Sequence, residues 1–296
     1  MKTVLIGAGG QLGSDIARVW PGDSLVKLTH ADIEVTDADQ AASVLAAQAP
    51  EFVINTSAFH NVDLCEIEPA RAFAVNAIGA LNLANACRDL GATLVHLSTD
   101  YVFSGDARRP YSESDIPDSR NVYGISKAAG EQIVRSRLER HCILRTSGLY
   151  GVAGSSGKGG NFVERMLQLQ RAGNDINVVD DQRLSPTSTA DLAGRVLELV
   201  ELGAIGTYHV TNSGSCSWFE FARAIFELAG VDARLNPTTT AAFAAKAQRP
   251  TFSALANTRI AELGLAPLRL WREALGEYLV AKGHVGARGA VTGGIA

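Results

Sequence analysis

Tyr123 and Lys127 are the two side chains of this sequence whose types and spacing could carry out proton transfer. Residues four positions apart on a helix project from the same face, so the phenol and the amine are expected to lie together. A free tyrosine has a pKa of about 10, and a nearby ammonium lowers the pKa of a phenol by stabilising its phenolate. The pair is therefore suited to exchanging a proton with a substrate oxygen, which the hydroxyl of Thr99 could also hold.

A glycine-rich loop lies between the first apolar run, residues 3–6, and a helical pattern. This strand–loop–helix context is typical of a dinucleotide-binding fingerprint. Gly7 permits the tight turn, Gly10 lets the backbone approach a pyrophosphate, and Gly13 lets the helix pack close to the sheet. The helix N-terminus then offers free N–H groups to the phosphates. The loop therefore predicts a nicotinamide dinucleotide as cofactor.

Residues 27–32 leave the choice between NADH and NADPH open. Asp32 lies close to where an acidic residue would bind the ribose 2′-hydroxyl of NADH. Lys27 or His30 could instead meet the 2′-phosphate of NADPH. Asp32 could equally be a loop or capping residue, because the local sequence is too irregular to fix its position.

Composition and charge are ordinary for a soluble globular protein. The 296 residues are 46% hydrophobic and 20% charged, with a net charge of −4 and no basic tract, so nucleic acid is not an expected partner. No apolar stretch approaches the roughly 20 residues that span a bilayer, and the first apolar run is too short for a signal peptide. Four widely spaced cysteines and six scattered histidines predict neither a metal site nor a disulfide, and favour the cytoplasm.

Short apolar runs alternate with helical patterns over the first two-thirds of the chain. This alternation predicts an α/β fold with a Rossmann-like, doubly wound parallel sheet. We expect residues 1–150 together with about 183–212 to form the NAD(P)-binding domain. A smaller C-terminal substrate-binding subdomain is expected from about 151–182 and 213–281, and residues 283–296 are expected to be a flexible tail.

The apolar runs also predict where the elements begin and end. A single long helix is expected over residues 68–90, and the helix that carries Tyr123 is expected to run to Leu138. Trp218 and Phe221 recur at helical spacing, so they are expected to be core rather than site residues. The strands of the sheet are expected at residues 3–6, 24–29, 52–55, 93–97, 141–145 and 206–210.

The glycine loop, Thr99, Tyr123 and Lys127, in this order, resemble the extended short-chain dehydrogenase/reductase superfamily. Within it, the chain is similar to the dTDP-4-dehydrorhamnose reductase family over about residues 1–281. Two segments, Gly-Gln-Leu-Gly at 10–13 and Ser-Thr-Asp-Tyr-Val-Phe at 98–103, are highly characteristic of that family. The other similar segments are residues 55–63, 161–163, 181–182, 186–187, 206–210 and 249–250.

The resemblance implies an enzyme that reduces a nucleotide-linked 4-keto-6-deoxy sugar with NADPH or NADH. Tyr123 would donate the proton, Lys127 would hold the nicotinamide ribose and tune Tyr123, and Thr99 and Asp100 would reach the sugar. The remaining cofactor contacts that it implies lie at the pyrophosphate, the adenine and the nicotinamide, and are Gly10, Gln11, Leu12, Asp32, Ile33, Ala58, Phe59, His60 and Leu97.

The sequence departs from the family at Gly148, which stands where the family has a tryptophan that would contact the sugar. An aromatic face there would contribute on the order of 1 kcal/mol, so a relative acting on another nucleotide-linked 4-keto sugar fits as well. Arg249, beside a rigid proline, could bind the substrate diphosphate through a bidentate contact. It could equally be a surface arginine.

Other functions fit the same fold. One is an epimerase or a reductase that acts on a different sugar. Another is a non-catalytic cofactor-binding regulatory subunit, because the methionine adenosyltransferase regulatory subunit resembles this same family. The intact Thr99, Tyr123 and Lys127 favour catalysis. The sequence does not fix the oligomeric state, and a homodimer is compatible with it.

Overall fold

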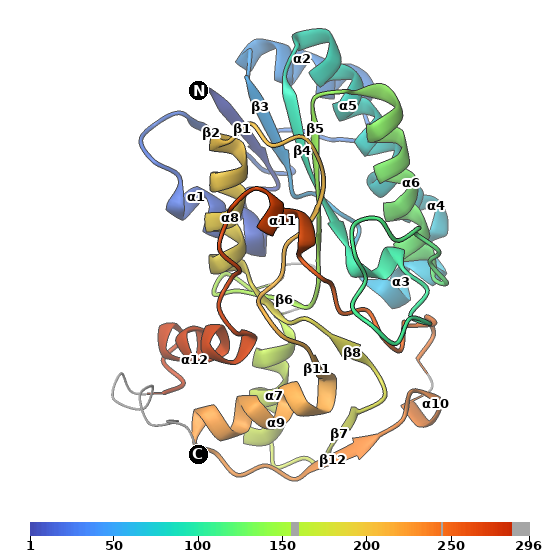
Figure 1. Ribbon diagram of the computed structural model, residues 1–296, viewed down its shortest axis with the longest axis vertical. Helices are drawn as coiled ribbons and strands as arrows, with labels where there is room; N and C mark the ends of the chain where they lie inside the picture. Colours follow the sequence, from blue (N-terminus) through green and yellow to red (C-terminus); the bar gives the residue numbers. More distant parts are fainter. Residues whose placement is uncertain (155–159, 244, 286–296) are drawn as a thin grey trace.

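The computed structural model describes residues 1–154, 160–243 and 245–285. A six-stranded parallel sheet and its helices fill the upper half of the molecule in Figure 1, and a smaller group of helices and short strands lies below. The strand order is β10-β5-β4-β3-β1-β2. β2 therefore lies on one side of β1 and β3 on the other, so the direction in which strands are added reverses at β1. In open α/β sheets, ligands bind at the carboxyl ends of the strands at such a reversal.

The observed sheet confirms the predicted α/β, Rossmann-like fold. Every predicted strand of the sheet is present, and all neighbouring pairs are parallel. β4 runs two residues farther than expected, so Thr99 is its last residue. The six strands are β1 (Thr3–Ile6), β2 (Leu25–Leu28), β3 (Phe52–Asn55), β4 (Thr93–Thr99), β5 (His141–Thr146) and β10 (Gly206–His209).

Helices cover both faces of the sheet, which makes it doubly wound. Successive residues of a strand point to opposite faces, so Leu5 packs with α1 and α8, whereas Val4 and Ile6 pack with α2, α5 and α6. Both clusters consist of buried apolar side chains. These helices are α1 (Gln11–Val19), α2 (Ala38–Gln48), α5 (Gly79–Leu90), α6 (Val122–Arg137) and α8 (Thr189–Glu201).

The helix predicted over residues 68–90 is present from Pro69 to Leu90, but it is not α-helical throughout. The chain forms α3 (Val62–Ile67) and α4 (Pro69–Phe73), then a π-helical turn, η1 (Ala74–Ile78), before α5. Asn76 in this turn accepts a hydrogen bond from the Phe59 backbone N at 2.9 Å and donates to the Phe59 carbonyl at 3.0 Å. The wider turn therefore ties the helices to the loop after β3, and such interruptions are frequent at functional sites.

A separate hydrophobic cluster lies below the sheet, where α7 (Phe162–Arg171), α9 (Trp218–Ala229) and α12 (Trp271–Ala281) pack together. Phe221 is fully buried in it, as expected, whereas Trp218 is half-buried.

The predicted domain boundaries stay a prediction, and the predicted tail from residue 286 onward lies outside the described residues. The shorter elements are β6 (Leu149–Tyr150), β7 (Ile176–Val179), β8 (Arg183–Leu184), β9 (Thr187–Ser188), β11 (Cys216–Ser217), β12 (Leu235–Thr238), α10 (Thr240–Phe243), α11 (Thr258–Glu262) and a 3₁₀ turn, η2 (Asp100–Val102).

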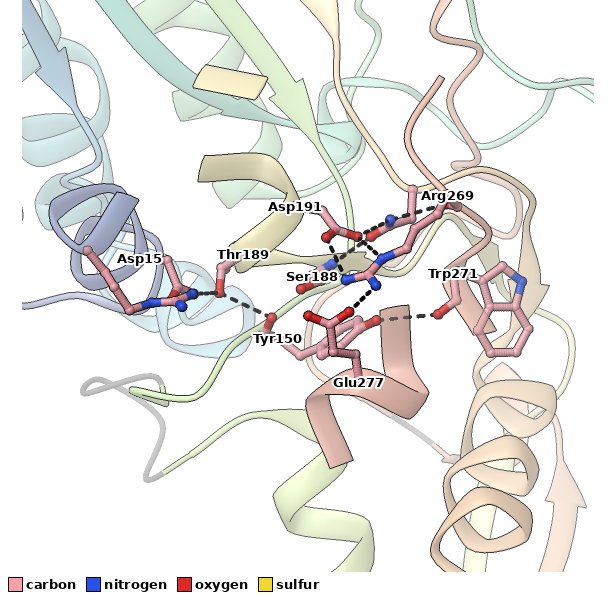
Figure 2. A network of polar contacts seen from close by, with 10 residues as sticks. Asp15, Tyr150, Ser188, Thr189, Asp191, Arg269, Trp271 and Glu277 are labelled. Atoms are coloured by element: carbon pink, nitrogen blue, oxygen red, sulfur yellow. Dashed lines mark hydrogen bonds and ion pairs between the residues drawn. The ribbon is translucent and has the colours of Figure 1, made fainter. Parts of the chain in front are cut away.

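A polar network around Asp191 joins α8 to the chain that leads into α12 (Figure 2). Asp191 accepts hydrogen bonds from two guanidinium nitrogens of Arg269 at 2.7 and 2.9 Å, and from the side-chain amide of Asn212 at 2.7 Å. Arg269 also pairs with Glu277 on α12. The Asp191 side chain is 15% exposed and that of Glu277 is 64% exposed, so Asp191 is the buried anchor of the network.

We expect Asp191→Ala to lower the free energy of unfolding by about 2 kcal/mol, because it leaves Arg269 and Asn212 without their main acceptor in a largely buried place. Glu277→Ala is the matched control, and we expect it to cost about 0.5 kcal/mol or less because its ion pair is exposed. Urea unfolding of both variants measures the difference. Equal losses would contradict the role given to Asp191.

Candidate active site

A cavity of about 1290 Å³ lies at the carboxyl ends of β1, β3, β4 and β5. It is larger than the roughly 300–1,000 Å³ of sites that hold one small ligand, which leaves room for a dinucleotide and a second molecule. Residues of α7 and α9 also line it, so both halves of the molecule contribute to its wall. The predicted site residues in the wall are Gly7, Gly10, Gln11, Leu12, Ile33, Ala58, Phe59, His60, Leu97, Thr99, Asp100, Tyr123, Lys127, Gly148 and Arg249.

The first turn of α1 begins at the wall of this cavity. The N-cap residue is Gly10, which has no side chain that could bond to the N–H groups of the first turn. The first turn, which is described in full, holds no acidic residue. The N–H groups of this turn therefore stay available to an anion, and the helix dipole favours negative charge there. These residues fit the pyrophosphate of a nicotinamide dinucleotide.

Two residues predicted to bind the cofactor, Gly13 and Asp32, are absent from the described cavity wall. A Cβ on Gly13 would come within 2.2 Å of the Gly7 carbonyl oxygen, so Gly13 allows α1 to pack on the loop. Asp32 is exposed and accepts hydrogen bonds from the backbone and hydroxyl of Thr29 at 2.8 and 2.7 Å, which hold the pKa of Asp32 below its usual range. Asp32 thus closes the turn after β2, whereas His30 lines the cavity.

α6 brings Tyr123 and Lys127 to the same wall. The Asn121 side chain accepts a hydrogen bond from the backbone N of Gly124 at 2.9 Å, which starts the helix at Val122. Lys127 is 2% exposed, and its Nζ donates to the Leu97 carbonyl at 2.6 Å. The amine is therefore held between the helix and the end of β4.

Burial changes the expected acidity of Tyr123. The sequence predicts that Lys127 lowers the pKa of the phenol, but burial raises the pKa of Tyr123, and its hydrogen bond with Thr99 opposes this only in part. The amine of Lys127 donates instead to Leu97. Tyr123 therefore keeps its proton at neutral pH, which suits a proton donor, because the alkoxide of a reduced carbonyl is a stronger base than a phenolate.

Asp100 lies next to Thr99 at the cavity wall. The hydroxyls of Thr99 and Ser147 donate to its two carboxylate oxygens at 3.1 and 2.8 Å. Burial raises the pKa of Asp100 to about 6, although hydrogen bonds from Ser253, Ser147 and Thr99 act in the opposite direction. Above that pH the carboxylate is an acceptor suited to a sugar hydroxyl.

Arg249 lines the cavity with its guanidinium already paired. Two of its nitrogens donate to the carboxylate of Asp63 at 3.2 and 2.8 Å. A bidentate contact with a diphosphate would have to replace this ion pair. Arg165 on α7 is exposed and lines the same cavity, so it offers a second guanidinium that the sequence analysis missed.

Gly148 has a backbone conformation that side chains rarely adopt, with a φ of +55°. A Cβ at this position would lie 2.6 Å from Cδ1 of Leu184 and 3.2 Å from Cα of Pro186. Leu184 itself lines the cavity. The wall beside residue 148 is therefore aliphatic, and a tryptophan at this position would require Leu184 to move.

An aromatic wall on the opposite half of the molecule was not predicted. The Phe162 ring lies 4.6 Å from that of Trp218 and nearly parallel to that of Phe221, and all three residues line the cavity. Helical spacing predicts that such residues pack together, but it does not show that the packed face reaches a cavity. Asn161, just before α7, lies 3.4 Å from the Gln11 side chain and so links α7 to the glycine loop.

Over the described ranges, no group of three or more His, Cys, Asp and Glu side chains is placed to hold a metal ion. In the same part of the chain, no helix has the length and apolar character needed to cross a membrane. The four cysteines are buried.

The parallel sheet, the glycine loop and the Thr99–Tyr123–Lys127 group define a Rossmann-type reductase of the extended short-chain dehydrogenase/reductase class. Residues 1–283 match the RmlD substrate binding domain family, and the chain belongs to that family. It is 42% identical over 280 residues to the spore coat polysaccharide biosynthesis protein SpsK of Bacillus subtilis, covering 94% of this chain and 96% of that one.

Two relatives carry the name that the motifs suggest. The dTDP-4-dehydrorhamnose reductase of Streptomyces griseus is 42% identical over 285 residues, covering 93% of this chain and 92% of that one. The crystal structure of dTDP-4-dehydrorhamnose reductase from Bacillus anthracis in complex with NADP has a TM-score of 0.90 at 38% identity, covering 95% of this chain and 100% of that one. The family resemblance inferred from the motifs is confirmed.

We expect Gly148→Ala to lower the free energy of unfolding by about 2–3 kcal/mol, from a left-handed conformation worth about 1–2 kcal/mol and from overpacking against Leu184. Gly203→Ala is the matched control, because Gly203 has a φ of +62° and open space around it. In a Leu184→Ala background, Gly148→Ala should lower the free energy of unfolding by less than it does in the wild-type protein. Urea unfolding that gives Gly148→Ala and Gly203→Ala the same loss would contradict the close contact.

Proposed function

We propose that this chain is an NADPH- or NADH-dependent reductase of a dTDP-linked 4-keto-6-deoxy sugar, of the dTDP-4-dehydrorhamnose reductase type. Family membership and relatives of that name at about 40% identity support the proposal. The observation that carries it is the placement of Thr99, Tyr123 and Lys127 in one cavity wall that also includes the start of α1. Proton transfer and dinucleotide binding can therefore act on one substrate.

The residues of this wall have separate roles in the proposed reaction. The nicotinamide, when bound, supplies a hydride to the carbonyl carbon of the sugar. Thr99 and Tyr123 hold the carbonyl oxygen by hydrogen bonds. As the π electrons of the C=O bond move to the oxygen, the Tyr123 hydroxyl gives that oxygen a proton and is left as a phenolate, which solvent reprotonates. A new C–H and a new O–H bond replace the π bond, and the C–O single bond remains. Lys127 binds the nicotinamide ribose and orients it.

The rest of the wall suits a sugar nucleotide. Above its pKa of about 6, the Asp100 carboxylate accepts a hydrogen bond from a sugar hydroxyl. Arg165, or Arg249 after release from Asp63, meets the diphosphate. Phe162 and Trp218 are partly exposed and line the cavity, so they offer an apolar aromatic surface to the nucleobase.

We also propose that the protein acts as a homodimer in the cytoplasm. Apolar side chains on neighbouring elements support the homodimer, because exposed apolar patches often mark contacts between chains. The four that carry the argument are 38–56% exposed and are Ile67, Phe73, Ile78 and Ile125. The cytoplasmic location rests on the composition alone.

Tyr123→Phe should lower kcat by about 10²-fold or more, because it removes the proton donor. Binding of NADPH should change little, since the ring stays in place. The assay follows the nicotinamide absorbance with dTDP-4-keto-6-deoxy sugar as substrate. Tyr101→Phe is the matched control, because its ring centroid lies 6.1 Å from that of Tyr123, and it should retain most of the turnover.

Wild-type turnover in Tyr123→Phe would remove Tyr123 from the mechanism. Cofactor binding by the wild-type protein without turnover of any nucleotide-linked keto sugar would instead favour a regulatory subunit.

A further inference from the structure

His96 is a buried neighbour of the Lys127 amine and has no part in the mechanism above. It is 1% exposed, on β4, and is the register partner of Asn55 on β3. Its Nε2 lies 3.4 Å from the Nζ of Lys127, and its Nδ1 lies 3.2 Å from the side-chain nitrogen of Asn55. A buried chain of polar groups therefore runs from β3 to the amine in the cavity wall.

The hydrogen bonds of Asn55 fix the tautomer of His96. The side-chain oxygen of Asn55 accepts hydrogen bonds from the backbone N and the hydroxyl of Ser57 at 3.0 and 2.6 Å. This orientation turns the amide nitrogen toward His96, and because that nitrogen is only a donor, Nδ1 must accept. A neutral imidazole carries a single ring proton, which therefore lies on Nε2 and faces Lys127.

The Nε2 proton affects the charge of Lys127. An ammonium has donors and no acceptor. A charged Lys127 would therefore face the Nε2–H donor of His96 with no acceptor between them, which is unfavourable. A neutral amine can accept from Nε2–H and still donate to the Leu97 carbonyl. Burial, assisted by the charge of Lys127, holds the pKa of His96 well below its usual range, so the ring stays neutral.

We propose that His96 is a positioning residue that acts on the reduction through Lys127: its Nε2–H, set by Asn55, faces the amine and disfavours its charged form. The proposal rests on the proposed function, in which Lys127 binds the nicotinamide ribose. The charged amine is the better donor to ribose oxygens. Removing Nε2–H should therefore extend activity to higher pH.

The other ionisable groups around Lys127 act in known directions. Burial lowers the pKa of Lys127 to about 8, and Glu131, one turn farther along α6, opposes this effect. Glu131 is itself held by Arg145 of β5 at 2.7 and 2.9 Å. Tyr123 and Asp100 face the cavity. Lys127 is thus charged below about pH 8 and loses its charge above it.

The test follows kcat/KM for NADPH against pH in the full-length protein. The wild-type value should fall above about pH 8, and in His96→Phe this fall should begin about one pH unit higher. His96→Gln, whose amide N–H can replace Nε2–H, should keep the wild-type profile. The matched control is His141→Phe, which removes another histidine of the sheet at the opposite end of β5 from Arg145 and should leave the profile unchanged. A profile that His96→Phe leaves unchanged overturns the proposal.

A second measurement keeps the proposal testable if His96→Phe does not fold. The ¹⁵N chemical shifts of the His96 ring in the cofactor-free protein, assigned by their loss in His96→Gln, should show a neutral ring protonated at Nε2. A proton on Nδ1, or on both nitrogens, overturns the proposal. This measurement needs no substrate, so its outcome is separate from a failure of the proposed function, which would appear as no oxidation of NADPH with any keto sugar.

Discussion

Burial of the Lys127 amine at the end of β4 is the constraint on which the candidate active site depends. A buried ammonium is costly unless hydrogen-bond partners surround it, and Lys127 is 2% exposed with its Nζ on the Leu97 carbonyl. The sheet therefore carries polar side chains where its interior would otherwise be apolar. Asn55 and His96, both buried, are register partners on β3 and β4.

A buried ion pair holds α6 in place one turn beyond Lys127. Glu131 accepts hydrogen bonds from Arg145 at 2.9 and 2.7 Å and from the Ser98 hydroxyl at 2.6 Å. Such a pair adds little net stability, but removing one partner is expensive because it leaves a buried charge alone. α6 cannot slide along the sheet without breaking this pair, so Tyr123 and Lys127 keep their places in the cavity wall.

Local patterns in the sequence predicted the parts of the molecule that depend on local structure. Apolar runs predicted the six strands, and the helical pattern up to Leu138 predicted the helix that carries Tyr123. Because the carboxyl ends of parallel strands meet at one edge, most of the predicted site residues, from Gly10 to Arg249, share one cavity wall.

The features that the sequence did not predict depend on contacts between distant residues. The π-helical turn forms where Asn76 meets Phe59 and Ser126, and the space at Gly148 is decided by Leu184. The raised pKa of Tyr123 follows from its burial first, which spacing along a helix cannot show. Asp32 is placed by the turn after β2, where its carboxylate accepts from Thr29.

The fate of the transferred hydrogen tests the central claim most directly. The wild-type protein would be incubated with NADPH deuterated at both C4 positions and with the dTDP-linked 4-keto-6-deoxy sugar, and the product examined by NMR. The proposed mechanism predicts one deuterium on C4 of the sugar for each NADPH oxidised. Oxidised cofactor with no deuterium on that carbon, or a sugar recovered unreduced from a protein saturated with NADPH, would contradict it.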